Sequence, residues 1–289
     1  MNQVVKIDRL AIIGVGLIGG SFALALKQAG AVREVIGVGR SAANLALARQ
    51  HGLIDRAVDF AEAGQADCIL LAMPVGEIAA VLAQLAPHLK AGAVVTDAGS
   101  TKANVIAAAR TALGARFNDF VPGHPIAGSE CNGPLAARAD LFQARKVVLT
   151  PEPETQAAAL ALVTSLWAVT GAQVEILDAA LHDQVFAAVS HLPHLAAYAL
   201  VNELAQRENS AEFFRFAASG FRDFTRIAGS SPEMWRDIAL ANHGALLNEL
   251  DAYIAALQQL RHAVEAGDHH TLLKIFSQAR NAREHWLNK

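Results

Sequence analysis

The chain has 289 residues, of which 53% are hydrophobic and 18% are charged, and this balance excludes a disordered polypeptide. Its 24 basic and 27 acidic residues give a net charge of −3, so we expect no nucleic-acid partner and favour a small-molecule substrate. Cys68 and Cys131 form no Cys-x-x-Cys pair, which argues against a cysteine zinc site and favours a reducing, cytoplasmic location.

Neither export nor a membrane partner is expected. The first ten residues carry charges where a signal peptide needs an apolar core. Mean hydropathy is +0.28, yet turn signals interrupt the apolar segments before they reach the roughly 18 uncharged residues of a membrane span. The apolar excess is therefore assigned to buried core and subunit interface.

The first half of the chain alternates short apolar runs with segments of helical character. We predict strands at residues 10–13, 35–38, 68–72, 93–96, 146–150 and 172–177. Helices are predicted at residues 21–28, 43–50, 76–89 and 156–169. Strands that are apolar on both faces are typical of a parallel sheet covered by helices, so residues 1–178 are predicted to form one doubly wound α/β domain of Rossmann type.

Strand signals end at Asp178. The remaining residues, 179–289, are rich in Ala and Leu and predict an all-α domain with helices at 180–207, 211–218, 232–260 and 269–286. These helices are apolar around more of their circumference than a domain of this size can bury alone. We therefore predict a homodimer formed through the C-terminal helices.

A glycine-rich turn connects the first strand to the first helix. Gly14, Gly16 and Gly19 match the G-x-G-x-x-G pattern in the strand-to-helix context that a dinucleotide-binding site requires. Gly14 permits the tight turn, Gly16 lets the backbone approach a pyrophosphate, and Gly19 lets the helix pack closely on the strand. The backbone N–H groups of Leu17 and Ile18, at the helix N-terminus, complete the predicted phosphate site.

The end of the second strand bears on the choice between NAD and NADP. NAD-specific sites usually carry Asp or Glu there, whereas this chain has Arg40 and Ser41. Arg40 and Ser41 can bind a 2′-phosphate by charge and by hydrogen bond, and no carboxylate at this position repels one. The sequence thus favours NADP over NAD, with a solvated Arg40 as the alternative.

Three further segments carry polar side chains that the core does not require. DAGSTK (97–102) and GHPIAGSE (123–130) follow strand ends, where the ligand crevice of an open α/β sheet lies. SHLPH (190–194) interrupts an apolar helix with two histidines and a proline, and GFRDFTRIA (220–228) places two arginines four residues apart.

Together with GVGLIGGS (14–21), these segments make the chain resemble the prephenate and arogenate dehydrogenases, the cyclohexadienyl dehydrogenases of tyrosine biosynthesis, over nearly its whole length. The resemblance implies an N-terminal dinucleotide-binding domain and a C-terminal dimerisation domain. It implies oxidative decarboxylation of prephenate or L-arogenate with hydride transfer to NAD(P). Both substrates stay open, because no residue decides between a keto and an amino side chain.

The resemblance also implies roles for individual residues. His124 is expected to accept the proton of the substrate hydroxyl, which a neutral imidazole can do, and Ser100 to orient that hydroxyl and the nicotinamide. Arg226 is expected to bind a substrate carboxylate through two parallel hydrogen bonds. Three further residues are expected to serve substrate binding: His191 at the substrate end of the pocket, Glu130 by shaping access to it, and Arg222 as a basic group beside it.

The same residues bear on two other functions and on a metal site. A β-hydroxyacid-type NAD(P) dehydrogenase usually needs a lysine in its second domain, but after residue 178 only Lys274 and Lys289 occur. A non-catalytic NAD(P)-binding sensor would not need Ser100, His124 and Arg226 to converge. His191 and His194 lack a third ligand at zinc-like spacing, so no metal is predicted, and His194 is assigned a packing role.

Overall fold

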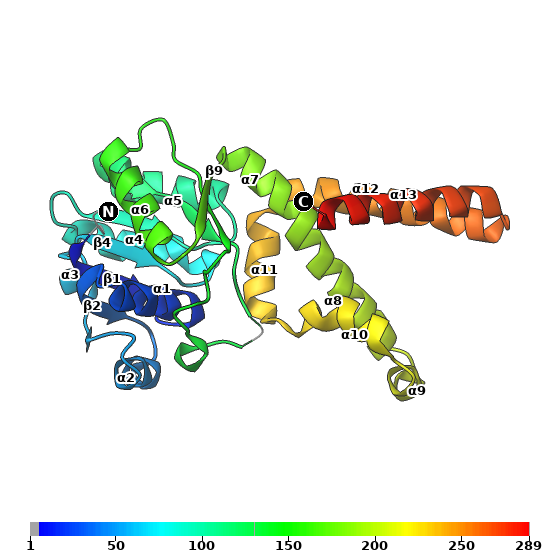
Figure 1. Cartoon of the computed structure of the whole chain (residues 1–289), viewed down its shortest axis with the longest axis horizontal. Coiled ribbons are helices and arrows are strands. Elements are labelled where there is room, and N and C mark those ends of the chain that lie inside the picture. The colour runs from blue at the N-terminus through cyan, green and yellow to red at the C-terminus, as the bar shows by residue number, and fades with distance from the viewer. Residues whose placement is uncertain (1–5, 130, 289) are drawn as a thin grey trace. The chain divides into compact units, whose positions relative to one another are not determined.

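A computed structural model describes residues 6–129 and 131–288 (Figure 1). By its internal contacts the chain divides into two compact units, Met1–His243 and Gly244–Lys289. The predicted domain boundary at residue 178 falls inside the first of these units and stays a prediction. The predicted combination of a parallel α/β sheet with a helical C-terminal part is confirmed.

The main sheet has six parallel strands in the order β3-β2-β1-β4-β5-β6. Their bounds are β1 (Ile7–Ile13), β2 (Val32–Val38), β3 (Arg56–Ala57), β4 (Cys68–Leu71), β5 (Val94–Asp97) and β6 (Phe120–Val121). The direction of winding reverses between β1 and β4. In such sheets the ligand lies outside the carboxyl ends of the strands at this point.

Helices and 3₁₀ turns connect the strands. They are α1 (Leu17–Gln28), α2 (Ala42–Gln50), α3 (Phe60–Ala63), η1 (Val75–Glu77), α4 (Ile78–Leu85), η2 (Ala86–His88), α5 (Ala103–Leu113), η3 (Gly114–Asp119), η4 (Pro134–Ala136) and α6 (Ala157–Val169). The sequence prediction omitted α5, although its buried Val105, Ile106, Ala109 and Leu113 follow helical spacing. It also omitted β3, β6 and β7, because strands of two or three residues are too short to show periodicity.

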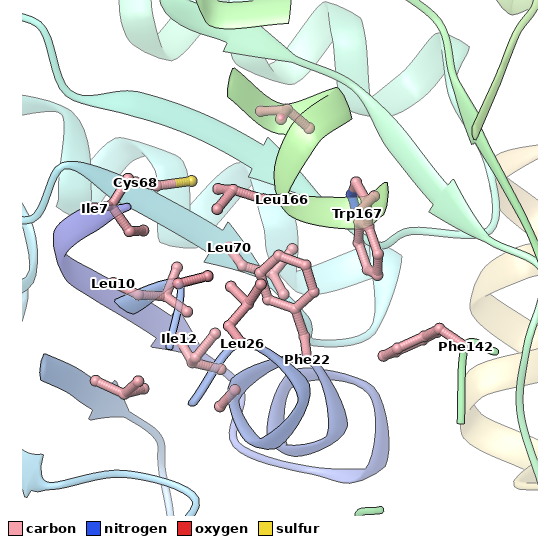
Figure 2. Close-up of a cluster of buried hydrophobic side chains, with 14 of the residues drawn as sticks. Ile7, Leu10, Ile12, Phe22, Leu26, Cys68, Leu70, Phe142, Leu166 and Trp167 are labelled. Carbon is pink, nitrogen blue, oxygen red and sulfur yellow. The ribbon is translucent and has the colours of Figure 1, made fainter. Parts of the chain in front are cut away.

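Successive side chains of the central strands point to opposite faces of the sheet, so each face has its own hydrophobic core. Leu10, Ile12 and Leu70 belong to one buried cluster, whereas Ala11 and Ile13 belong to the other. Figure 2 shows the first cluster, in which Phe22 of α1 approaches Trp167 of α6 with ring centroids 4.4 Å apart. Burial on both faces explains why these strands are almost entirely apolar.

A second sheet contains β7 (Gly123–Pro125), β8 (Lys146–Leu149) and β9 (Gln173–Ile176). β8 is antiparallel to β7 and parallel to β9. We expected the last two strands to extend the doubly wound sheet, and this detail was wrong. Pro122, which has no backbone N–H, directly follows the two-residue β6, and the chain then turns into β7.

Helical structure follows β9. The first unit contains α7 (Ala179–Phe186), the π-helical turn η5 (Ala187–His191), α8 (Leu192–Ala205), α9 (Ser210–Arg215), α10 (Ser219–Thr225), η6 (Arg226–Gly229) and α11 (Pro232–Ala241). Next come α12 (His243–Glu265) and α13 (His269–Leu287). The helix predicted at 232–260 is in fact interrupted at Asn242, whose buried side-chain amide bonds to the backbone oxygen of Asp183.

Within the part of the chain that the structure describes, one helical stretch, Ala179–Ala205, is long and apolar enough to cross a membrane by length and composition alone. His182, Asp183 and His191 lie on this stretch, and all three are buried and hydrogen-bonded inside the protein.

Candidate active site

The glycine turn after β1 has the geometry that its sequence predicts. Gly14 has φ +94°, and a Cβ there would lie 2.6 Å from the backbone oxygen of Ala72. At Gly19 a Cβ would lie 2.6 Å from the oxygen of Gly14, so α1 packs against the turn only because side chains are absent. A Cβ on Gly16 would meet nothing within 4 Å, which leaves room for a ligand to approach the backbone.

A pocket of about 520 Å³ opens at this turn, between the carboxyl ends of β1, β2 and β4. Its lining includes Gly14 and Gly16 from the turn, and Arg40 and Ser41 from the end of β2. The volume falls within the range of small-molecule sites, roughly 300–1,000 Å³. The Ser41 Oγ accepts a hydrogen bond from the backbone N of Asn44 at 3.2 Å and so caps α2. The hydroxyl group can still donate a hydrogen bond of its own, because this contact uses it only as an acceptor.

His124, on β7, is connected to two residues of α7. Its Nδ1 lies 2.9 Å from the Nε2 of His182, and the Nδ1 of His182 lies 2.8 Å from the Oδ1 of Asp183. An ionised carboxylate only accepts hydrogen bonds, so the His182 Nδ1 is protonated and donates a hydrogen bond to Asp183. The Nε2 of neutral His182 is then an acceptor, and the Nδ1 of His124 must donate to it. The lone pair of His124 is therefore on Nε2.

Asp183 is itself held by the start of α5. Its two carboxylate oxygens accept hydrogen bonds from the backbone N atoms of Lys102 and Ala103, at 2.8 and 2.9 Å. A carboxylate at a helix N-terminus is stabilised by the unpaired N–H groups there. Burial would raise the pKa of Asp183, but the bonds from His182, Ala103 and Lys102 outweigh it and lower the pKa below its usual value.

A buried ion pair joins the end of β5 to the start of β7. The Lys102 ammonium group donates to Asp97 and, at 2.6 Å, to the backbone oxygen of Gly123. Asp97 also accepts from the backbone N atoms of Gly99 (2.8 Å) and Gly123 (3.0 Å). The pair thus fixes the two loops that carry Ser100 and His124. Ser100 is half-buried in the first of them.

The two histidines of the SHLPH segment differ in their surroundings. His191 is buried, its Nδ1 lies 3.1 Å from the Nδ2 of Asn242, and its Nε2 has no hydrogen-bond partner among the described residues. His194 is half-buried and stacks on Trp235, with centroids 3.5 Å apart and planes 20° from parallel. Pro193 lies in the first turn of α8, immediately after the π-helical turn that ends at His191.

The remaining predicted substrate residues lie farther along the chain. Arg222 is on α10 and Arg226 begins η6, and both are exposed. Burial lowers the pKa of His194, and the positive charge of Arg226 lowers it further. Glu130 lies outside the described residues, so the structure does not place it.

Burial keeps the histidines of this site neutral. It lowers the pKa of His124 well below 6.5, and the neighbouring His182, Lys102 and His191 lower it further. Burial also lowers the pKa of His182, against the hydrogen bond to Asp183, and brings the pKa of His191 to about 4. Neutral imidazoles are the forms that can accept a proton at neutral pH.

Sequence reasoning missed several members of this arrangement. His182, Asp183 and Asn242 carry no motif of their own, and Asp97 and Lys102 stood out only as the ends of DAGSTK. The adjacent His182 and Asp183 near the start of a helix are a weak signal, because such a pair is common on helix surfaces. Among the described residues no three His, Cys, Asp or Glu side chains gather where they could hold a metal ion.

The fold and the glycine turn are those of a nucleotide-binding α/β protein, and a buried histidine network follows the last strand of its main sheet. Residues 22–176 match the family model of the prephenate dehydrogenase nucleotide-binding domain, and residues 178–278 match that of the prephenate dehydrogenase dimerization domain. The chain therefore belongs to the prephenate dehydrogenase family, as its resemblance predicted.

Individual relatives agree with this assignment. The chain is 39% identical over 278 residues to a cyclohexadienyl dehydrogenase of Zymomonas mobilis, covering 95% of this chain and 94% of that one. Its structure superposes on prephenate dehydrogenase from Aquifex aeolicus in complex with hydroxyphenyl propionate and NAD⁺, with a TM-score of 0.92, 33% identity and coverage of 98% and 99%. Arogenate dehydrogenase from Synechocystis superposes with a TM-score of 0.80, 32% identity and coverage of 96% and 99%.

Proposed function

We propose that this protein catalyses the oxidative decarboxylation of prephenate, L-arogenate or both with NAD(P), yielding 4-hydroxyphenylpyruvate or L-tyrosine in cytoplasmic tyrosine biosynthesis. The observation that carries the proposal is the chain of hydrogen bonds from Asp183 through His182 to His124, at 2.8 and 2.9 Å. These bonds leave His124 as a neutral imidazole whose lone pair is on Nε2. His124 follows the last strand of the main sheet, at the edge where the nucleotide pocket opens.

His124 acts in this proposal as the proton acceptor. The C–H bond at the hydroxyl-bearing ring carbon breaks, and the hydrogen leaves with both bonding electrons as hydride, which a bound nicotinamide would accept. The hydroxyl proton passes to the Nε2 of His124. The bond to the ring carboxylate then breaks, its electrons complete the aromatic ring, and carbon dioxide leaves. His124 returns the proton to the phenolic oxygen, so the imidazole ends the cycle neutral.

The other predicted residues bind and orient the substrate. Ser100, in the loop fixed by Asp97 and Lys102, orients the hydroxyl toward His124. Arg226 binds a carboxylate with its planar guanidinium group, and Arg222 adds positive charge. The Nε2 of His191 has no hydrogen-bond partner among the described residues and is proposed to bond to a polar atom of the substrate. Glu130 is proposed to shape access to the pocket.

The nucleotide pocket fits a dinucleotide cofactor, because Gly16 leaves open space beside the backbone. The cofactor would supply the hydride acceptor. The phosphate site comprises the glycines at 14, 16 and 19 with the backbone N–H groups of Leu17 and Ile18. Arg40 and Ser41 line the same pocket and support NADP as the preferred cofactor, with NAD as the alternative.

We further propose a homodimer formed by residues 179–289, with residues 1–178 as the nucleotide-binding domain. Apolar side chains are exposed in both compact units of the chain. In the first unit these include Leu181, Val189, Leu200 and Phe216, and in the second Leu247, Ile254, Leu273 and Phe276. A second copy would remove such side chains from water, which favours association.

One assay tests the reaction. The initial rate of reduced-nicotinamide formation is measured with prephenate or L-arogenate, each with NAD or NADP. We expect turnover with at least one combination, and the pattern identifies substrate and cofactor. Absence of turnover in all four, from folded protein that still binds cofactor, would overturn the proposal in favour of another hydroxyacid dehydrogenase or a nucleotide sensor.

A further inference from the structure

The end of β2 carries no carboxylate, but the turn after β4 brings one to the lining of the nucleotide pocket. Glu77 ends the 3₁₀ turn η1 after β4 and lines the pocket together with Arg40. Its Oε1 lies 3.1 Å from the Nη1 of Arg40. The residue that would recognise a 2′-phosphate is therefore already paired with a negative charge.

The backbone of the turn that carries Glu77 is packed against α11. Val75 of the same turn is buried, and a Cβ on Gly76 would lie 2.9 Å from the Oδ2 of Asp237 on α11. The Asp237 carboxylate forms an ion pair with Arg236, whose Nη2 lies 2.7 Å from Oδ1. The backbone of the turn is thus packed against α11, while the half-exposed side chain of Glu77 remains able to adjust to a ligand.

The ion pair itself is readily opened. The side chain of Arg40 is 83% exposed and that of Glu77 is 43% exposed. Exposed ion pairs of this kind contribute little to stability, because water solvates both charges when they separate. A ligand phosphate can therefore replace Glu77 as the partner of Arg40 at small cost.

We propose that Glu77 is a specificity-determining residue for the cofactor, acting against Arg40. Its carboxylate offers an acceptor to the ribose 2′-hydroxyl of NAD and repels the 2′-phosphate of NADP. Arg40 does the opposite, because it attracts the phosphate. The two residues together let one pocket accept both cofactors. This inference rests on the proposed nucleotide site, and it assigns to η1 the discrimination that β2 usually provides.

The test measures binding, so that it does not depend on turnover. Affinities for 2′,5′-ADP and for ADP are determined by titration calorimetry at fixed salt for the full-length protein and for Glu77→Gln and Arg40→Gln. Glu154→Gln is the matched control, because Glu154 pairs with Arg110 at the surface and does not line the pocket. It removes the same charge from a comparable ion pair.

We expect Glu77→Gln to raise the ratio of 2′,5′-ADP affinity to ADP affinity about fivefold to tenfold, and Arg40→Gln to lower it by a similar factor. Glu154→Gln should leave the ratio unchanged. An unchanged ratio in Glu77→Gln, with both nucleotides still bound, overturns the role of Glu77 alone. Failure of the wild-type protein to bind either nucleotide overturns the nucleotide site and this inference with it.

Discussion

The Nδ1 of His124 lies 2.9 Å from the Nε2 of His182, across 58 positions of the sequence. This contact joins a strand that follows the nucleotide-binding sheet to the first helix of the C-terminal part. Because the single N–H of neutral His182 donates to Asp183, its Nε2 must accept from His124, and the contact therefore determines which nitrogen of His124 carries the lone pair. The proposed chemistry therefore depends on packing between segments that are far apart in the chain.

Replacing the proposed base should separate catalysis from cofactor binding. We expect His124→Asn to reduce kcat by about 10²- to 10⁴-fold, because the proton acceptor is lost. Cofactor affinity, measured by fluorescence titration, should stay unchanged, since His124 does not line the nucleotide pocket. Full activity in this variant would contradict the assignment.

In the wild-type protein the lowered pKa of His124 should place the acidic fall in activity below pH 6.5.

His182 should act as a positioning residue. In His182→Gln the proton on His124 is no longer confined to Nδ1, so kcat should fall by about 10- to 100-fold with little change in cofactor affinity. The acidic limb of the pH profile should shift as well, which a purely structural role would not cause. His51→Gln, at an exposed helix end, is the control. An unaltered pH profile in His182→Gln would count against the relay.

Arg226 should contribute to substrate binding more than to the chemical step. We expect Arg226→Ala to raise KM by about tenfold or more while kcat changes less, because the carboxylate contact exists in the ground state. Arg226→Lys should restore little, since an ammonium group cannot form two parallel hydrogen bonds. Steady-state kinetics decide the point, and an unchanged KM in the alanine variant would refute the assignment.

Stability should depend on pH through the buried histidines. The pKa of His191 falls from 6.5 to about 4 on folding, and those of His124 and His182 are lowered too. Below pH 6.5 the unfolded chain binds protons that the folded chain does not, so the free energy of unfolding should fall between about pH 6.5 and pH 4. Denaturant titrations across this range measure it. His191→Phe should flatten the slope, and a slope equal to that of the wild-type protein would contradict this contribution.

The ion pair of Lys102 and Asp97 should matter for stability as well as for the site. Both side chains are fully buried, so Lys102→Met leaves an unpaired carboxylate and should lower the free energy of unfolding by about 3–5 kcal/mol. The double variant Lys102→Met with Asp97→Asn removes both charges and should recover part of that loss. Chemical denaturation of the three proteins provides the comparison, and equal stability of single variant and wild type would exclude the effect.

The sequence alone determined the parts of this protein that depend on local pattern. Apolar runs that alternate with helical segments predicted the parallel sheet. The glycines at 14, 16 and 19 predicted the turn beside the pocket, because the backbone conformation and close packing that a glycine permits are properties of its single position. Short motifs were also sufficient for the resemblance to the family. The same motifs singled out His124 as the proposed base.

Contacts between side chains from different elements could not be predicted from the sequence, because they depend on how the elements pack. The pairing of β8 and β9 in a second sheet, the break at Asn242, the relay through His182 and the pairing of Arg40 with Glu77 each join residues distant in sequence. Such contacts leave no periodic signal, because they arise from how separate elements pack. The identity of the proposed base could be read from a motif, but its free nitrogen and its lowered pKa follow from burial among residues that no motif names.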